Sequence, residues 1–403
     1  MTQPLIMTHT PDKSPELHQH RSRISATADP KPTSAREVAH ERLHPVTERT
    51  RPTVLISSAG RRVELLRAFR RTVDTLSADQ REPGRVLAAD CSWYSGAFHE
   101  ADDAFLVPRC TDPAFVPRMI ELCASRHVDL VVPTIDTELP AYAAARDQFA
   151  AVNTTVAISS PEVVAIAGDK ERTHSWLTSE GFPTVLQGTI SDVRADPETW
   201  QFPLIVKPRF GSASLGVALV RDVAGLERVI ADWPTILGPM ADANRDLVVQ
   251  SVARGVEYTV DTLVIREAGV ASGGLGVVAV PRRRIEVRSG EVSKAVTVRS
   301  PLLIELAEKV SVALPGAYGP LNIQMFFDED AGRVSVIELN ARFGGGYPLS
   351  YKAGADFPRA LLQEARGMPV TARLHGWRDN LVMLRYDAAV FVNGSRTSRE
   401  GTP

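Results

Sequence analysis

The chain has 403 residues, a net charge of -2 and 44% hydrophobic residues, which suffices for two or three globular domains with a large core. The near-neutral charge argues against a nucleic-acid partner or an anionic membrane surface, and no apolar run approaches the roughly 18 residues of a membrane span. The three cysteines, Cys91, Cys110 and Cys123, show no paired or metal-ligand spacing, so we expect reduced thiols in a cytoplasmic protein.

Both ends of the chain are expected to be disordered tails. Residues 1–50 are polar, and their histidines follow neither a helical nor a strand period. The segment lacks the apolar groups that would offset the entropy of ordering it. A metal-binding tail is the alternative that its histidines leave open. Residues 393–403 form a similar polar tail.

Folded sequence begins with a strand, a glycine turn and a helix, which is how a Rossmann-like unit starts. Val54–Ile56 forms the strand and Gly60 lies in the turn. Further elements are predicted as strands at 86–90 and 128–132 and a helix at 115–125. Residues 51–160 are therefore expected to form one α/β domain. A dinucleotide site is only weakly supported, because no GxGxxG motif follows the first strand.

Two connecting helices and a small α+β subdomain are expected over residues 161–255. Ser160 and Pro161 give the N-cap and N1 pattern of a helix that Gly168 ends. A second helix starts after Asp169. Short strands, turns and one further helix then follow, as in a small lid.

A strand, a lysine and a loop of small residues occupy positions 204–217. The loop contains two glycines that let the backbone approach an anion and two serines that add donors, namely Gly211, Gly216, Ser212 and Ser214. The spacing is similar to that of a P-loop, but the Lys-Ser/Thr pair is missing and a strand follows instead of a helix. We expect a phosphate site of another kind, with Lys207 on the first strand. A surface hairpin is the alternative.

A dense cationic segment runs from Arg282 to Lys294 on a strand–turn–strand pattern. Alternation places four charged side chains on one face: Arg282, Arg284, Glu286 and Arg288. A solvated face is the ordinary interpretation of such a run. The alternative is that Arg284, Arg288 and Lys294 neutralise a terminal phosphate and an incoming carboxylate, because guanidinium groups match planar oxyanions and lysine acts as a point charge.

Two strands predicted at 321–327 and 334–340 are joined by a loop of hairpin length. An even register gathers polar side chains on one face of this hairpin: Asn322, Gln324, Glu338 and Asn340, with Val336. These polar groups are oxygen ligands that carry one carboxylate charge, which suits Mg²⁺ when nucleotide phosphates supply the remaining negative charge. A polar solvent face is the alternative.

Arg342 follows the second of these strands on the same face and precedes three glycines, 344–346. A guanidinium beside a metal, followed by backbone open to close approach, suits stabilisation of an acyl phosphate and its tetrahedral adduct. Two acidic residues, Asp136 and Glu138, follow the predicted strand at 128–132. They either bind the amino group of a substrate or cap the next helix, and the sequence leaves both roles open.

The order Gln324, then Glu338-x-Asn340-x-Arg342, resembles the metal and phosphate signature of the ATP-grasp superfamily. The resemblance is to one synthetase half of the carbamoyl phosphate synthase large subunit and to single-unit carboxylate–amine ligases, and it covers about Val54 to Met368. It implies an α/β ATP-grasp fold in successive parts: a Rossmann-like pre-ATP-grasp domain (51–160), linker helices and a lid (161–255), a C-terminal subdomain with an antiparallel sheet and the metal site (256–370), and an extension (371–392).

The resemblance also implies roles for single residues. Lys170 and Lys207 would bind phosphates, the segment from Gln250 to Val252 would hold adenine, and Glu257 would accept from the ribose hydroxyls or reach the lid. The alternative for the segment that contains Gln250 is an ordinary β-hairpin. ATP and Mg²⁺ would be required, with Mn²⁺ as a substitute, and a homodimer is common in the family.

The implied activity is activation of a small-molecule carboxylate by ATP, followed by attack of an amine on the acyl phosphate. The expected acid is an amino acid. Two alternatives remain open: a phosphotransferase that makes an acyl or carbamoyl phosphate as product, and an ATP-binding regulator without turnover. The sequence shows no nucleophile elbow, no Ser/His/Asp set and no zinc spacing, and acyl-phosphate chemistry requires none of these.

Overall fold

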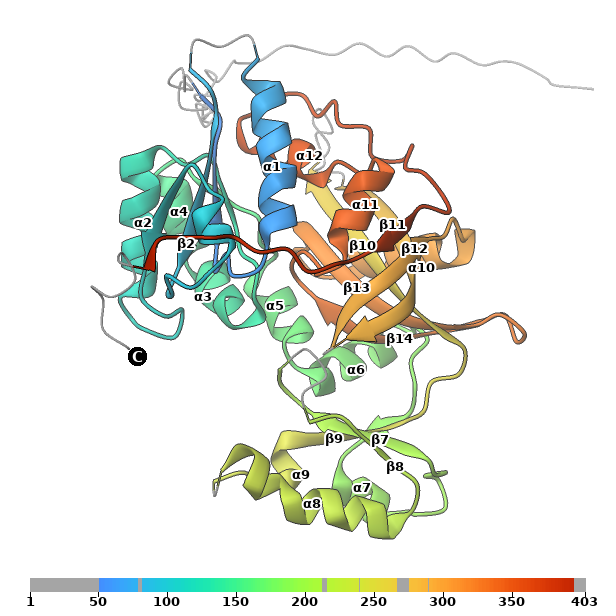
Figure 1. The fold of residues 1–403 in the computed structure, drawn as a ribbon. Coiled ribbons are helices and arrows are strands. Elements are labelled where there is room, and N and C mark those ends of the chain that lie inside the picture. Colours follow the sequence, from blue (N-terminus) through green and yellow to red (C-terminus); the bar gives the residue numbers. More distant parts are fainter. Residues whose placement is uncertain are drawn as a thin grey trace, which may run out of the picture. The chain divides into compact units, whose positions relative to one another are not determined.

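The computed structural model describes residues 51–78, 82–211, 216–238, 240–266, 275–288 and 290–394. The expectations for residues 1–50, for most of the C-terminal tail, and for Ser212 and Ser214 lie outside these ranges. The described residues form three sheets, whose strands are labelled in Figure 1. Among the described helices, none combines the length and apolar character that crossing a membrane requires.

The first sheet is parallel and has the strand order β3-β2-β1-β4-β5. Its strands are β1 (Thr53–Ser57), β2 (Arg85–Asp90), β3 (Asp103–Leu106), β4 (Leu130–Val132) and β5 (Thr155–Val156). The α-helices that follow them are α1 (Val63–Leu76), α2 (Phe115–Arg126), α3 (Leu139–Ala144) and α4 (Arg146–Ala151). All five residues of β1 are buried, as expected for a parallel strand covered on both faces. The predicted Rossmann-like unit is present.

Two helices, α5 (Pro161–Ala167) and α6 (Lys170–Ser179), lead into the second sheet. The predicted cap at Ser160 is present, because its hydroxyl accepts from the amide of Val163 at 3.2 Å. The second helix starts after Asp169 as expected, and the Asp169 carboxylate accepts from the amide of Glu171 at 3.0 Å.

The second sheet is antiparallel, with the order β6-β9-β7-β8, and we call it, together with its helices, the lid subdomain. It comprises β6 (Gln187–Gly188), α7 (Ile190–Ala195), β7 (Leu204–Pro208), β8 (Ala218–Val220), α8 (Val223–Leu237), α9 (Ala243–Asp246) and β9 (Leu247–Ser251). Its buried apolar residues, among them Trp200 and Trp233, form a cluster of their own.

The third sheet is antiparallel and has the order β14-β13-β10-β11-β12-β15. Its strands are β10 (Val256–Arg266), β11 (Leu275–Arg288), β12 (Glu291–Thr297), β13 (Gly319–Asp328), β14 (Arg333–Asn340) and β15 (Val382–Leu384), and its helices are α10 (Pro301–Ala313), α11 (Tyr347–Ala353) and α12 (Phe357–Ala365). Strand β15 comes from the segment 371–392, which we expected to form a C-terminal extension. It pairs with β12 and so belongs to this sheet.

The first and third sheets share their hydrophobic cores. One cluster joins Leu55 and Tyr142 to Ile323 and Leu303, and a second joins Phe69 of α1 to residues of α11 and α12. Figure 1 shows α1 beside these two helices, and residues of α1 contact both. This shared packing brings the carboxyl edge of the parallel sheet to the end of β14, where the candidate site lies.

Candidate functional site

The polar face of the β13–β14 hairpin has the predicted register. We call this face, which carries Gln324, Glu338 and Asn340, the metal face, because the sequence predicts metal ligands there. Asn322 pairs with Asn340 and Gln324 pairs with Glu338. A β-bulge then follows between Gln324 and Met325. The expectation that Val336 shares this face is wrong: the bulge turns Val336 into the buried core, where it is fully buried.

Not every polar residue on this face is available to a ligand. The amide of Asn322 donates to the buried carboxylate of Asp261 at 2.8 Å, so its side chain is committed. Within the described ranges, Gln324 and Glu338 take part in no side-chain hydrogen bond or ion pair. The described residues also contain no group of three or more His, Cys, Asp or Glu side chains able to hold a metal. A cation here would therefore depend on amide oxygens, one carboxylate and oxygens supplied by a ligand.

Lys207 on β7 is 6% exposed and forms no ion pair with any described residue. Burial lowers the pKa of its ammonium to about 8, and the positive charge of Lys170 acts in the same direction, while Glu338 and Glu257 oppose the shift. Lys207 and Glu338 thus lie close enough to interact although they come from different sheets. A buried cation without an ion-pair partner makes Lys207 a candidate to bind an anion.

Lys170, at the start of α6, lies beside the glycine loop that follows β7. Its ammonium donates to the carbonyl of Gly211 at 2.8 Å, and its amide donates to the carbonyl of Arg209. Gly211 has a φ of +100°, a conformation that favours glycine. The structure therefore brings together Lys170, Lys207 and Gly211 of the predicted phosphate site.

The segment expected to hold adenine follows β9. Gln250 is buried, and its amide donates to Gln187, whose own amide donates to the backbone carbonyl of Lys170 at 2.9 Å. Gln187 was not predicted, because its role depends on pairing between β6 and β9. Val252 is 42% exposed just beyond the strand. The amide of Ser251 donates to the carbonyl of Leu186 at 2.9 Å, so Val252 is the first residue of this segment beyond the strand.

Glu257 on β10 forms an ion pair with Arg284 on β11. Burial raises the pKa of the Glu257 carboxyl, and Arg284 opposes that shift. Glu338 also acts on Glu257, so this pair lies near the metal face. One guanidinium nitrogen of Arg284, Nε, is buried without a partner. Arg284 therefore has capacity for a further acceptor.

Arg288 and Lys294 lie in a different ion cluster from Arg284. Both pair with Glu286, whose pKa is lowered to about 2, chiefly by hydrogen bonds from Lys294 and Arg288. Register shifts on either side of Glu286 interrupt the strict alternation that the sequence suggested. Arg282 belongs to the core: it is 1% exposed, and its Nε and Nη2 donate to Asp261 at 2.6 and 2.9 Å.

Arg342 connects the metal face to the parallel sheet. It donates through Nε and Nη2 to Asp136 at 2.7 and 2.6 Å, and through Nη2 to the side-chain oxygen of Asn340 at 3.2 Å. Asp136 thus lies at the site. Glu138 has the structural role: its fully buried carboxylate accepts from the hydroxyls of Ser57 and Ser58 and from the amides of Thr134 and Ile135. Burial raises its pKa.

Arg62 is a further candidate that the sequence analysis missed. It follows β1 as Asp136 follows β4, and these strands are neighbours in the parallel sheet. Ligands of such sheets bind at the carboxyl ends of the strands, so the position of Arg62 directly after the glycine turn was a usable signal.

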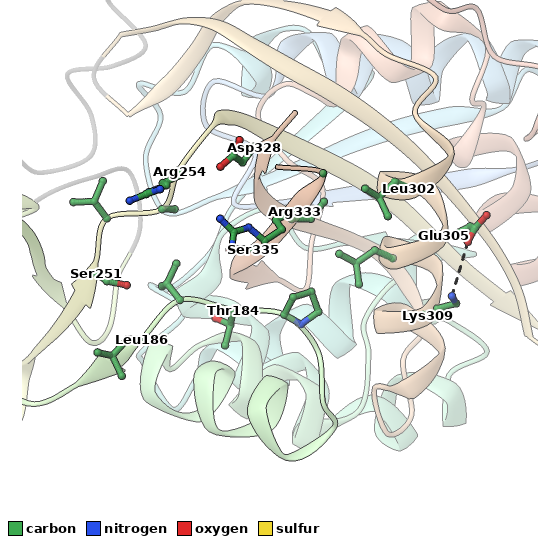
Figure 2. Close-up of a pocket in the computed structure, with 17 residues that line it drawn as sticks. Thr184, Leu186, Ser251, Arg254, Leu302, Glu305, Lys309, Asp328, Arg333 and Ser335 are labelled. Atoms are coloured by element: carbon green, nitrogen blue, oxygen red, sulfur yellow. Dashed lines mark ion pairs between the residues drawn. The ribbon is translucent and has the colours of Figure 1, made fainter. Parts of the chain in front are cut away.

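A separate cavity of about 710 Å³ lies at the two chain connections of the lid subdomain (Figure 2). It is lined by the incoming segment 183–186, the outgoing segment 251–254, α10 and the β13–β14 turn. Among the predicted site residues only Val252 is in its described lining. This cavity lies at the turn end of the hairpin, and the metal face lies at the opposite end.

Comparisons with known proteins agree with this architecture. Residues 54–157 match the PylC-like N-terminal domain, and residues 243–386 match the family described as ATP-grasp in the biosynthetic pathway with Ter operon. The carbamoyl phosphate synthase large chain of Bifidobacterium animalis subsp. lactis (strain AD011) is 24% identical over 265 residues, which are 62% of this chain and 22% of that one. The present chain therefore spans about a fifth of that relative.

Two further relatives are matched over most of their length. The formate-dependent phosphoribosylglycinamide formyltransferase of Rhodococcus jostii (strain RHA1) is 26% identical over 339 residues, 79% of this chain and 78% of that one. The biotin carboxylase domain of Hydrogenobacter thermophilus 2-oxoglutarate carboxylase, solved with MgADP, ADP and bicarbonate, has a TM-score of 0.62 at 18% identity and covers 83% of this chain and 73% of that one. This likeness confirms the predicted fold. The chain therefore has the ATP-grasp fold, with an N-terminal segment similar to PylC-like N-terminal domains and a C-terminal segment similar to an ATP-grasp family.

Proposed function

We propose that the protein is an ATP-dependent carboxylate–amine ligase that forms an amide or peptide bond through an acyl phosphate and releases ADP and phosphate. The observation that carries the proposal is the buried ammonium of Lys207, which has no ion-pair partner and lies near Glu338. A nucleotide phosphate between Lys207 and a cation on Glu338 would balance both charges. The name of the Rhodococcus jostii relative supports the proposal, because it mentions both an acid, formate, and a glycinamide.

The residues divide into a nucleotide group and a metal group. Lys170 and Lys207 would bind phosphate oxygens, the backbone after Gln250 would hold adenine up to Val252, and Glu257 would accept from the ribose. Gln324, Glu338 and Asn340 would hold Mg²⁺, or Mn²⁺ in its place. Their all-oxygen donor set with one carboxylate fits a hard cation that shares phosphate ligands. When bound, the metal ions would reduce the negative charge that opposes nucleophilic attack on the γ-phosphate.

The remaining cations would serve the acid and the acyl phosphate. Arg342 lies within hydrogen-bond distance of Asn340, so its guanidinium can reach an oxyanion beside the metal face. Arg284 has a free Nε and lies next to the same face. Arg288 and Lys294 can contribute only if they leave Glu286. The amine nitrogen then attacks the carbonyl carbon, the bond to the phosphate oxygen breaks, and the displaced protons pass to solvent.

A coupled ADP-release assay tests this function. ADP should appear only when ATP, an acid and an amine are all present, and amino-acid pairs should be screened first. Release of AMP instead of ADP would contradict the acyl-phosphate route. Trapping with hydroxylamine separates the alternatives: a hydroxamate formed at full rate without any amine would identify an enzyme whose product is the acyl phosphate, and ATP binding without hydrolysis under every mixture would identify a regulator.

A further inference from the structure

The glycine loop that follows Arg342 packs against the turn after β1. A side-chain Cβ at Gly345 would lie 3.5 Å from Nη1 of Arg62 and 4.0 Å from the carboxylate carbon of Glu291. This loop therefore leaves room beside a guanidinium of the first sheet and a carboxylate of the third. A larger side chain at position 345 would extend toward these two groups, and glycine has none.

Arg62 is the unbalanced charge of this region. Its Nη2 donates to the backbone carbonyl of Thr134 at 3.1 Å, and the described residues offer it no ion pair. The neighbouring guanidiniums have carboxylate partners: Arg342 pairs with Asp136 and Arg385 pairs with Glu291 at 2.9 Å. Burial lowers the pKa of Arg62 to about 10, and the like charge of Arg342 adds to the effect. A largely buried cation without an ion-pair partner among the described residues favours an anion from outside the chain.

Both signs of charge meet at Arg62. The charges of Glu291 and Asp136 act on its guanidinium together with that of Arg342. Neither carboxylate is buried: the Asp136 side chain is 28% exposed and that of Glu291 is 43% exposed. Each of these carboxylates already pairs with another guanidinium, Asp136 with Arg342 and Glu291 with Arg385, so Arg62 is the cation that an outside carboxylate would balance. A zwitterion carries a carboxylate and an ammonium a few ångströms apart, so it could place its carboxylate at Arg62 and its ammonium beside the exposed edge of either acid.

The region also borders the candidate metal face. Arg342 contacts Asp136 on one side and Asn340 on the other, so a molecule at Arg62 is separated from the metal face by one side chain. A substrate bound there can present its amino group to a carbonyl activated beside Arg342. This geometry fits the second substrate of the reaction better than the acid that ATP activates.

We propose that the amine substrate is an α-amino acid whose carboxylate binds Arg62 and whose amino group lies beside Asp136 and Glu291. This inference rests on the proposed ligase function and names the class of its second substrate. In the reaction the nitrogen forms the new C–N bond, phosphate leaves the carbonyl carbon, and two protons pass from the ammonium to solvent. The carboxylate of the amino acid does not react, so the product retains a free carboxylate.

A substrate comparison tests the proposal. For each acid–amine pair active in the ADP-release screen, the amino acid that serves as the amine is compared with its α-carboxamide, and the acid is kept the same. Wild-type enzyme should lose about 10- to 100-fold in kcat/KM with the carboxamide, the range of one charge-assisted hydrogen-bonded pair. Arg62→Gln should lose a similar factor with the amino acid and little with the carboxamide. Equal wild-type use of both compounds, with ADP still released, would overturn this inference and leave the ligase function intact.

A binding measurement provides a readout without turnover. The melting temperature is recorded with each of the twenty amino acids and with the corresponding carboxamides, in the presence of MgADP. A rise with at least one amino acid, absent for its carboxamide and absent in Arg62→Gln, is expected. No rise with any amino acid would overturn the proposal even if no active pair is found. Arg62→Lys, which keeps the charge, should retain part of the rise and so separates lost binding from lost folding.

The control is the neighbouring residue. Arg61→Gln removes the same charge from the same turn, but Arg61 is exposed and lies outside the contacts of the glycine loop. The charge of Arg61 acts on Glu291 but not directly on the carboxylate position at Arg62, so Arg61→Gln should keep the preference for the amino acid over its carboxamide and lose much less kcat/KM than Arg62→Gln. If Arg61→Gln lost the carboxylate preference as fully as Arg62→Gln, the effect would be one of overall charge, and the specific site at Arg62 would be excluded.

Discussion

Replacing Lys207 by methionine should weaken nucleotide binding and at the same time stabilise the protein without nucleotide. The pKa of Lys207 falls from 10.5 to about 8 in the folded chain, chiefly through burial. At about 1.4 kcal/mol per pKa unit, the protonated amine destabilises the folded state by about 3 kcal/mol at neutral pH. Methionine retains the apolar stem, but Glu338 loses a nearby cation, so the expected net gain is about 1–3 kcal/mol.

The pH dependence of this gain has a defined sign. Below about pH 8 both the folded and unfolded chains hold the proton, so the destabilisation by Lys207 is fully present. Between about pH 8 and 10.5 the unfolded chain binds a proton that the folded chain has released, so wild-type stability rises with pH and the advantage of the variant shrinks. Urea denaturation at a series of pH values, without nucleotide, measures both effects.

The matched control for this variant is Lys170→Met. Lys170 donates a hydrogen bond to Gly211 and is only half-buried. Its removal loses that bond and relieves its repulsion of Lys207, so it should reduce the affinity for MgADP while stabilising the protein less than Lys207→Met. Lys207→Met should lose about 10- to 100-fold in MgADP affinity, measured by calorimetry, the scale of a charged hydrogen bond. A Lys207→Met variant that is less stable than wild type, or that binds MgADP equally well, would refute the reasoning.

Four further substitutions have separate expected outcomes. Glu338→Gln should reduce turnover at least ~10²-fold with folding retained, whereas Asn340→Ala should lose less activity because water can replace a neutral ligand. Steady-state rates over a range of Mg²⁺ concentrations measure both effects, and wild-type activity of Glu338→Gln at low Mg²⁺ would contradict the proposed metal site. Glu138→Gln should destabilise the fold by about 2–4 kcal/mol in urea denaturation, because one carboxylate satisfies four donors; unchanged stability would contradict its structural role. Gly346→Ala should destabilise by about 1–3 kcal/mol, since its Cβ would lie 2.1 Å from Nη1 of the fixed Arg282; a wild-type denaturation midpoint would show that the loop can move away.

The sequence was sufficient where local rules decide the outcome. Alternation and a short loop predicted the pairing of Gln324 with Glu338. The same rules placed Val336 on the wrong face. A β-bulge beside Glu338 turns Val336 into the core, and no residue pattern in the sequence indicates that bulge. The cap at Ser160 and the helix start after Asp169 were likewise predictable from local chemistry.

Contacts between distant segments could not be predicted in this way. Arg342 meets Asp136 across 206 positions of the chain, and the choice of Glu257 for Arg284 but Glu286 for Arg288 follows from strand order and register shifts. The sequence shows that charges alternate on a strand, but not which charges face them. For this reason the sequence could not assign separate roles to Asp136 and Glu138. In the structure Asp136 pairs with Arg342, and Glu138 accepts hydrogen bonds from the turn after β1.

The most direct test of the ligase mechanism is an oxygen-transfer measurement. The acid of an active pair is labelled with ¹⁸O in its carboxylate, incubated with the enzyme, ATP, Mg²⁺ and the amine, and the released phosphate is examined by ³¹P NMR. An acyl phosphate carries one carboxylate oxygen into the phosphate when the amine displaces it, so phosphate with a single ¹⁸O should form in step with ADP. Unlabelled phosphate, or AMP in place of ADP, would contradict the account.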